Sequence, residues 1–97
     1  MNSKNDTRFS VLYNIIGSSN ATKKQREAAW QKLLLIEDNF GFSIIIAAEF
    51  SWLQFSNEYK EKAWQELLKR DIQNDEINLR YLVSNAPEPW GKRARDL

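Results

Sequence analysis

Apolar residues recur at helical spacing in six short stretches of the chain, and residues that favour turns separate these stretches. Gly17 stands where a C-cap glycine is expected, and Gly41 marks a break between two stretches. Thr22 and Gln25 have the spacing of a capping box, and a Pro-Glu-Pro sequence at 87–89 ends a helix. Strand signals are weak. The pattern therefore predicts an all-α fold with about six short helices, over residues 8–16, 22–36, 42–54, 57–71, 76–85 and 88–97.

Two stretches that lie 34 residues apart are nearly identical. Residues 27–34 are Glu-Ala-Ala-Trp-Gln-Lys-Leu-Leu, and residues 61–68 are Glu-Lys-Ala-Trp-Gln-Glu-Leu-Leu. Six of the eight positions agree, and they include Trp30 and Trp64. A weaker third copy covers residues 92–97. Agreement at this density indicates an internal repeat, in which a first apolar helix is followed by an amphipathic second helix.

The repeat predicts one domain over residues 8–97, after a flexible N-terminal tail over 1–7. Its three two-helix units would cover about 8–36, 42–71 and 76–97. One such pair cannot bury its own apolar face, so neighbouring pairs stack and share a continuous core. We therefore expect a right-handed helical-repeat stack, which is an α-solenoid-like fold, with Trp30 and Trp64 packed between units.

From residue 8 onward the chain resembles the HEAT/armadillo class of α-helical repeats. Residues 79–83, Leu-Arg-Tyr-Leu-Val, together with residues 86–90, Ala-Pro-Glu-Pro-Trp, and Ala94 are similar to a repeat unit of bacterial helical-repeat proteins. The resemblance implies a binding surface, usually for protein and sometimes for nucleic acid, and very rarely catalysis.

The composition removes most catalytic chemistry. The 97 residues include no Cys and no His, which excludes thiol nucleophiles, thiolate metal sites and the commonest general base. The sequence has no phosphate-binding loop, dinucleotide motif, nucleophile elbow or EF-hand loop. The carboxylate pairs at 37–38 and 75–76 fall at predicted helix starts, where they complement the helix dipole. We therefore expect no enzyme activity, no cofactor and no metal.

The charge balance favours a protein partner over nucleic acid. The chain carries 14 Lys and Arg against 13 Asp and Glu, a net charge of +1. Two basic clusters nevertheless keep nucleic acid as the alternative partner: Lys23, Lys24 and Arg26, and Lys92, Arg93 and Arg95. The longest apolar run, 44–48, is far below the roughly 20 residues that a membrane span needs, and the N-terminus lacks a signal-peptide pattern. We expect a cytoplasmic protein without membrane contact, and the oligomeric state stays open.

Polar residues recur at unit spacing on the second helices of the first two predicted units. They form the candidate partner-binding surface: Gln31, Lys32, Lys62, Gln65 and Glu66. The charges of the helix at 57–71 are spaced four residues apart, which is equally typical of a solvated helix face. Three aromatic residues near the predicted turns, Trp52, Phe55 and Trp90, are candidates for partner contact or for ordinary burial.

Glu49 falls near the centre of the apolar arc of the predicted helix at 42–54, where its sister positions 34 residues away are apolar. Arg80 is likewise charged where its sister positions are apolar. Because a lone buried carboxylate is costly, one hypothesis is a partly buried Glu49–Arg80 ion pair between the second and third units. The alternatives are that the helix ends or bends before Glu49, which then faces water, or that Glu49 is a functional carboxylate.

Overall fold

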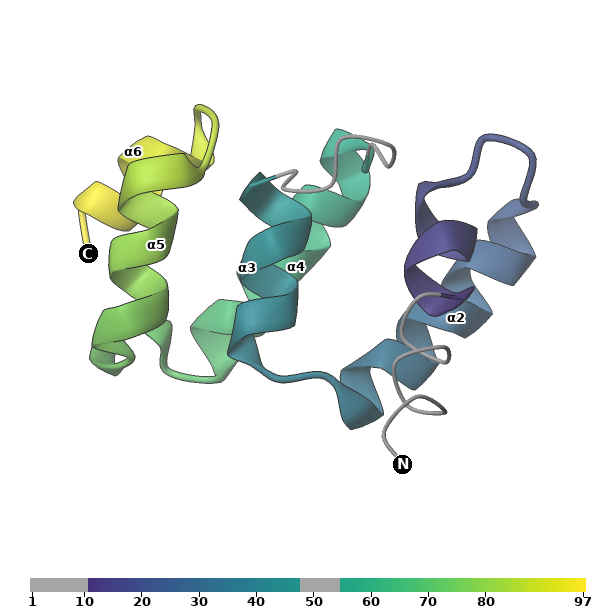
Figure 1. The fold of residues 1–97 in the computed structure, drawn as a ribbon, viewed down its shortest axis with the longest axis horizontal. Helices are drawn as coiled ribbons and strands as arrows, with labels where there is room; N and C mark the ends of the chain where they lie inside the picture. The colour runs from purple at the N-terminus through teal and green to yellow at the C-terminus, as the bar shows by residue number, and fades with distance from the viewer. Residues whose placement is uncertain (1–10, 48–54) are drawn as a thin grey trace.

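The computed structural model describes residues 11–47 and 55–97, and within these ranges every regular element is a helix. A helical segment over 11–17 comes first, followed by the elements labelled in Figure 1. They are α2 (Lys23–Ile36), α3 (Asn39–Ala47), α4 (Asn57–Lys69), the short 3-10 helix η1 (Ile72–Asn74), α5 (Glu76–Asn85) and α6 (Trp90–Arg95). The prediction of an all-α fold is confirmed.

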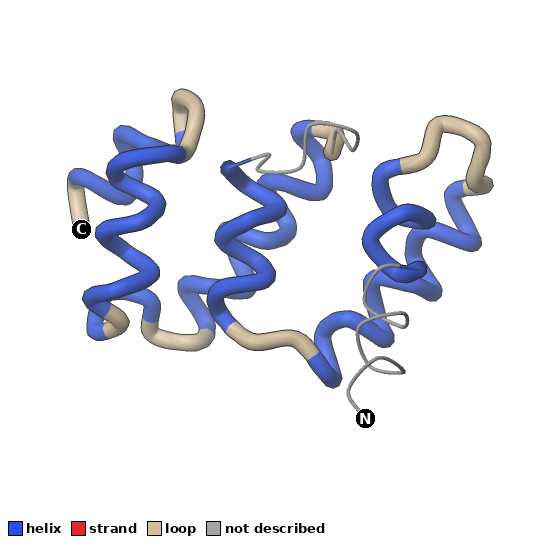
Figure 2. The backbone as a smooth tube through the Cα atoms, viewed as in Figure 1, coloured by secondary structure: helices blue, strands red, loops and turns tan. Residues whose placement is uncertain are grey.

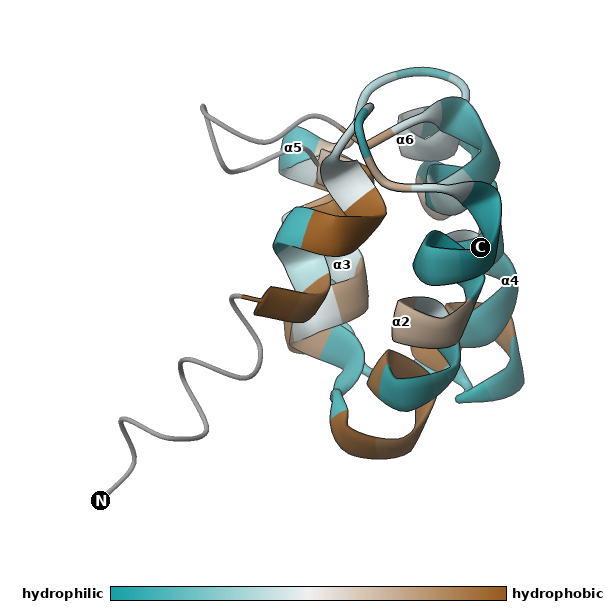
Figure 3. Ribbon diagram, turned by 90° about the vertical axis from the view of Figure 1, so that its right-hand side faces the viewer, coloured by the Kyte–Doolittle hydropathy of each residue, from teal (hydrophilic) through white to brown (hydrophobic). Residues whose placement is uncertain are grey.

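The helices follow one another as three pairs along the long axis of the molecule (Figures 1 and 2). The segment 11–17 pairs with α2, α3 pairs with α4, and α5 pairs with α6. The side view in Figure 3 separates two layers, with α3 and α5 in one and α2, α4 and α6 in the other. The turns therefore lie at the two ends of the helices, above and below the long axis in Figure 1. The surfaces described below are at these two ends.

Side-chain caps start the second helices where the sequence places them. The Thr22 hydroxyl accepts from the Gln25 N–H (3.0 Å) while the Gln25 side chain accepts from the Thr22 N–H (2.8 Å), so the predicted capping box is confirmed. Ser56 caps α4 in the same way, since its hydroxyl accepts from the Tyr59 N–H.

One apolar core runs through all three helix pairs. Trp30 and Trp64 are both 4% exposed, as predicted. The Trp30 ring lies 5.5 Å from the Phe42 ring and 5.7 Å from the Tyr59 ring, between centroids. These contacts join α2 to α3 and α4, and aromatic packing of this kind adds stability beyond the buried area.

The two glycines in the first half of the chain do not act as predicted. Gly17 is the last residue of its helix, and no described glycine has a positive φ. Gly41 lies inside α3 and is buried, because α3 begins at Asn39 rather than at residue 42. A Cβ at Gly41 would lie 2.0 Å from Cδ of Glu37, so the glycine makes room for that carboxylate. The left-handed residue is Asp71, with φ 62°, after the end of α4.

The first helices follow the 34-residue offset only loosely. Ile45 is fully buried, whereas its partner position Val11 is 49% exposed. The predicted tail over 1–7 and Trp52 lie outside the described residues.

Candidate partner-binding edge

The predicted surface on the second helices divides into two groups. Gln31, Lys32 and Gln65 are exposed on α2 and α4. Lys62 instead reaches across to Glu27 on α2, at 3.7 Å, and Glu66 pairs with Arg70 at 2.8 Å. Lys62 thus joins α4 to α2, while Glu66 makes an ion pair one turn further along at the end of α4.

Glu27 and Glu61, the first residues of the two repeat copies, each accept a hydrogen bond from the next helix pair, one from a tyrosine and one from an arginine. Oε2 of Glu27 accepts from the Tyr59 hydroxyl (2.8 Å), and Oε1 of Glu61 accepts from Nη1 of Arg93 (2.5 Å). Each donor follows its acceptor by 32 residues. Burial and the bond to Glu27 raise the pKa of Tyr59 to about 12. Hydrogen bonds from Gln65 and Arg93 lower the pKa of Glu61.

Arg70 fastens the end of α4 to the end of α2. Its Nη1 donates to the carbonyl of Glu37 (2.6 Å), its Nη2 to the carbonyl of Leu34 (2.9 Å), and its Nε to Glu66 (2.8 Å). The guanidinium also lies 4.7 Å from the centroid of the Phe42 ring. Since α2 has no basic residue in its last turn, Arg70 supplies the cation that favours a helix C-terminus. This contact could not be foreseen from the spacing of charges along α4 alone.

Exposed apolar side chains gather at the end of the molecule where α2 and α4 end and α3 and α5 begin (Figure 1). Leu35 is 85% exposed and Ile77 is 81% exposed. The large apolar residues of this surface, which we name the turn edge, are Leu35, Ile36, Phe40, Leu68 and Ile77.

Two adjacent hollows open on the turn edge and share Arg70 and Asp75. The first, which we name the Asp75 hollow, has a volume of about 420 Å³ and is lined by Glu37, Asp38, Asn39, Phe40, Arg70, Asp75 and Asn78. The second has a volume of about 530 Å³ and is lined by Arg70, Asp71, Asn74, Asp75, Glu76 and Ile77. Phe40 lines the first hollow, and Ile77 lines the second.

Hydrogen-bond acceptors dominate the Asp75 hollow. The side-chain amides of Asn39 and Asn78 each donate to Oδ2 of Asp75 (2.8 Å), and these bonds lower the pKa of Asp75, which stays ionised. Oδ1 of Asn78 is buried and accepts no hydrogen bond from the described residues. The three nitrogens of Arg70 already donate to protein oxygens. The hollow therefore suits a group that donates hydrogen bonds or carries positive charge.

Glu37 links the first helix pair to the start of α3. Its Oε2 accepts from the Tyr13 hydroxyl and its Oε1 from the Asp38 N–H (2.8 Å). Burial raises the pKa of the Glu37 carboxyl, and burial together with the Glu37 bond raises the pKa of Tyr13. The sequence did not indicate that the Glu37 side chain packs against Gly41. A spacing of four residues does not show that a carboxylate will lie over the start of the next helix.

The two basic clusters differ in how far their charges are neutralised. All three cations of the second cluster pair with carboxylates: Lys92 with Asp96 (3.0 Å), Arg93 with Glu61 (2.5 Å) and Arg95 with Glu88 (3.0 Å). In the first cluster, Lys23 and Lys24 are exposed and Arg26 turns toward its own helix start.

Arg80 is exposed, with 75% of its side chain accessible, and pairs with Glu76 one turn earlier on α5 at 2.5 Å. Glu49, its predicted partner, lies outside the described residues. Phe55 and Trp90 are both buried, so these two aromatic side chains belong to the core.

In the ranges 11–47 and 55–97, no group of three or more acidic residues has the arrangement of a metal site, and no helix has the length and apolar character to cross a membrane. Comparison of the chain with family models, with curated proteins and with solved structures gave no match.

Proposed function

We propose that this protein is a non-catalytic protein-binding module, built as a stack of HEAT/armadillo-like helical repeats, whose partner docks on the turn edge. The observation that carries the proposal is the combination of exposed apolar side chains with two polar hollows on one end of the molecule. Contiguous exposed apolar residues rimmed by polar groups are typical of protein-binding surfaces.

Two recurring features support the repeat part of the proposal. Trp30 and Trp64 occupy equally buried positions on α2 and α4. Glu27 and Glu61 then receive hydrogen bonds from residues at the same distance further along the chain. Successive units of a solenoid contact only their neighbours and repeat one interface, which is the pattern that these contacts follow.

The charges on the turn edge favour a basic, amphipathic partner segment. Asp38 and Asp71 are exposed there, and Asp75 is held ionised. Apolar side chains of the partner would cover Phe40 and Ile77, while a Lys or Arg would enter the Asp75 hollow. Nucleic acid is the weaker alternative, because the second basic cluster is neutralised by its own carboxylates.

A library of random linear peptides, selected against the immobilised protein, tests the proposal. We expect selected peptides to combine apolar residues with Lys or Arg. Their affinity, measured by fluorescence anisotropy, should fall by about tenfold or more in the Leu35→Ser, Ile77→Ser double variant, because both side chains are exposed anchors.

Val83→Ser is the matched control, since Val83 is an exposed apolar residue of α5 away from the turn edge, and it should leave the affinity unchanged. Equal binding by wild type and the double variant would overturn the docking site. Loss of binding in a Gln31→Ala, Gln65→Ala variant instead would move it to the second helices. Tight, salt-sensitive binding of duplex DNA would favour the alternative function.

A further inference from the structure

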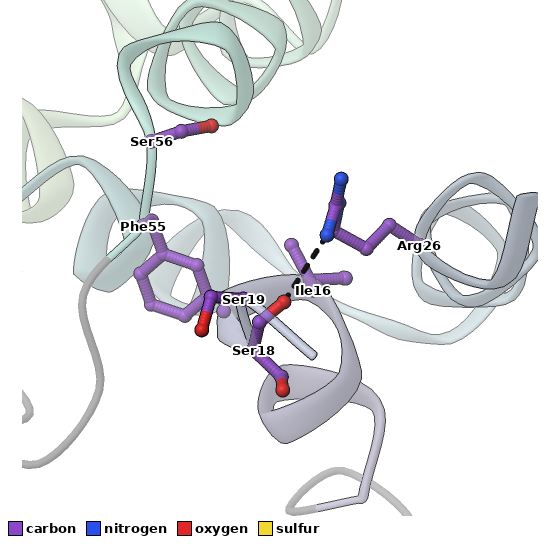
Figure 4. Close-up of a pocket in the computed structure, with 7 residues that line it drawn as sticks. Ile16, Ser18, Ser19, Arg26, Phe55 and Ser56 are labelled. Carbon is purple, nitrogen blue, oxygen red and sulfur yellow. Dashed lines mark hydrogen bonds between the residues drawn. The ribbon is translucent and has the colours of Figure 1, made fainter. Parts of the chain in front are cut away.

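A third hollow lies at the opposite end of the molecule from the turn edge, and Figure 4 shows its side chains. It has a volume of about 280 Å³, and we name it the Arg26 hollow after its charged residue. Its lining residues come from the end of the first helix and the turn after it, from α2, and from the two residues before α4: Ile16, Gly17, Ser18, Ser19, Arg26, Phe55 and Ser56.

Arg26 enters this hollow with only part of its hydrogen-bonding capacity used. Its Nη1 donates to the carbonyls of Ser18 (3.1 Å) and Ala21 (2.6 Å). Its Nε and Nη2 have no partner among residues 11–47 and 55–97. In Figure 4 the guanidinium extends between Ser18 and Ser56, with one nitrogen directed away from the Ser18 bond. Two or more N–H groups are therefore available to a ligand.

The serine hydroxyls of the hollow are also placed to donate. Oγ of Ser56 already accepts from the Tyr59 N–H, and Oγ of Ser18 accepts from the Asn20 N–H (3.1 Å). Each hydroxyl proton is left without an acceptor in the described part of the chain. None of the described residues that line the hollow is a carboxylate. Its polar groups thus offer donors and positive charge, which is the recognition chemistry of an anion.

We propose that the Arg26 hollow binds a tetrahedral oxyanion, the phosphate of a small phosphomonoester or inorganic phosphate. A tetrahedral anion presents acceptor oxygens in several directions, so it can receive bonds at once from Arg26 and from the Ser56 hydroxyl, which faces Arg26 across the hollow in Figure 4. A planar carboxylate reaches fewer of them. Exposed Lys23, one turn before Arg26 on α2, adds positive charge near this end of the helix.

Calorimetric titration with inorganic phosphate, at constant ionic strength in chloride, tests the proposal. We expect saturable binding by the wild type with a dissociation constant of about 1 mM, the range that a ligand of so few atoms reaches. Phenyl phosphate should bind at least as well, and acetate should bind about tenfold more weakly. The phosphate and phenyl phosphate arms distinguish a free anion from an esterified one.

Arg26→Gln should weaken phosphate binding about tenfold, because the amide can still donate to the Ser18 or Ala21 carbonyl but carries no charge. Lys24→Gln is the matched control, since it removes one exposed charge from the same basic cluster, and it should change binding less than twofold.

Ser56→Asp gives a second variant that preserves the fold, because Asp also caps a helix. Its carboxylate would occupy the anion position opposite Arg26, so phosphate binding should disappear while Ser56→Asn retains it. Equal weakening by Arg26→Gln and Lys24→Gln, equal affinity for acetate and phosphate, or no saturation by the wild type would each overturn the proposal. None of these outcomes depends on the turn edge or its partner.

Discussion

The Asp75 hollow and the Arg26 hollow lie at opposite ends of the same helix stack and have opposite chemistry. In the first, Asp75 is ionised, Asn78 has an acceptor without a partner among the described residues, and all three nitrogens of Arg70 donate to protein oxygens. In the second, Arg26 and two serines have donors to spare. A net charge of +1 conceals this contrast. The state of an arginine's hydrogen bonds, rather than its presence, decides which ligand a hollow suits.

The largest effect is expected at Arg70, because its side chain is committed to the fold. Arg70→Ala should lower the free energy of unfolding by about 3 kcal/mol, since it removes two bonds to the end of α2 and leaves Glu66 without its cation. Urea unfolding followed by tryptophan fluorescence measures the change.

Lys69→Ala is the control, as Lys69 is exposed beside Arg70 and should change stability by about 0.5 kcal/mol or less. If Arg26→Ala proved as destabilising as Arg70→Ala, the contrast between an occupied and an available arginine would fail.

A smaller effect is expected where Gly41 makes room for Glu37. Gly41→Ala should destabilise the protein by about 1 kcal/mol, because the new methyl group displaces the Glu37 carboxylate from the Tyr13 hydroxyl. In a Glu37→Ala background the same change should stabilise by about 0.5–1 kcal/mol, the ordinary advantage of Ala over Gly within a helix. A double-mutant cycle measured by urea unfolding gives the coupling, and additive effects would rule out the steric explanation.

The smallest effect concerns the pH dependence of the same carboxyl. The pKa of the Glu37 carboxyl is raised in the folded protein, so the fold favours the protonated side chain. Its contribution to stability is therefore fully present below the ordinary pKa of 4.5 and is lost as the pH rises through the pKa in the folded state. Glu37→Gln should therefore stabilise the protein at pH 7 by about 0.5 kcal/mol, a modest figure because the side chain is partly exposed to solvent. The advantage should vanish near pH 3, as followed by urea unfolding at several pH values.

Asp75→Asn provides the opposite trend as a control. Asn also caps a helix, so the start of α5 is kept. The pKa of Asp75 is lowered in the folded protein, so its ionised carboxylate stabilises the fold above the ordinary pKa of 3.8. That contribution is lost as the pH falls through the pKa in the folded state. The variant should be less stable than wild type at pH 7 and equal to it in acid. Parallel pH profiles for the two variants would contradict the assignment of opposite environments to these neighbouring carboxyls.

Local signals in the sequence account for much of the fold. Thr22 and Gln25 start α2 as a capping box does, and the repeated tryptophans are buried as the apolar arcs require. What failed depends on contacts between distant parts of the chain. Gly41 looked like a helix break because no local rule shows that Glu37 covers it.

The candidate site was less predictable than the fold. Gln31, Lys32 and Gln65 are exposed as a partner surface requires, yet Lys62 pairs with Glu27 of α2 and Glu66 pairs with Arg70 at the end of α4. The turn edge escaped detection because Leu35 and Ile77 belong to apolar helical patterns whose exposure depends on how the pairs are placed together. The donors left over in the Arg26 hollow likewise depend on which carbonyls Arg26 meets.

The hydrogen bond between Glu27 and Tyr59 joins the first helix pair to the second, and the sequence supplies a second glutamate that could accept the same bond. Because Glu61 occupies the place of Glu27 in the second repeat copy, a duplicated 34-residue unit inserted after it would present its own Tyr59 to Glu61 at the spacing already used. The duplicated Phe42 and Tyr59 rings would likewise meet Trp64 as they now meet Trp30. Under the proposed repeat architecture, the protein could therefore be lengthened by whole modules that reuse this contact.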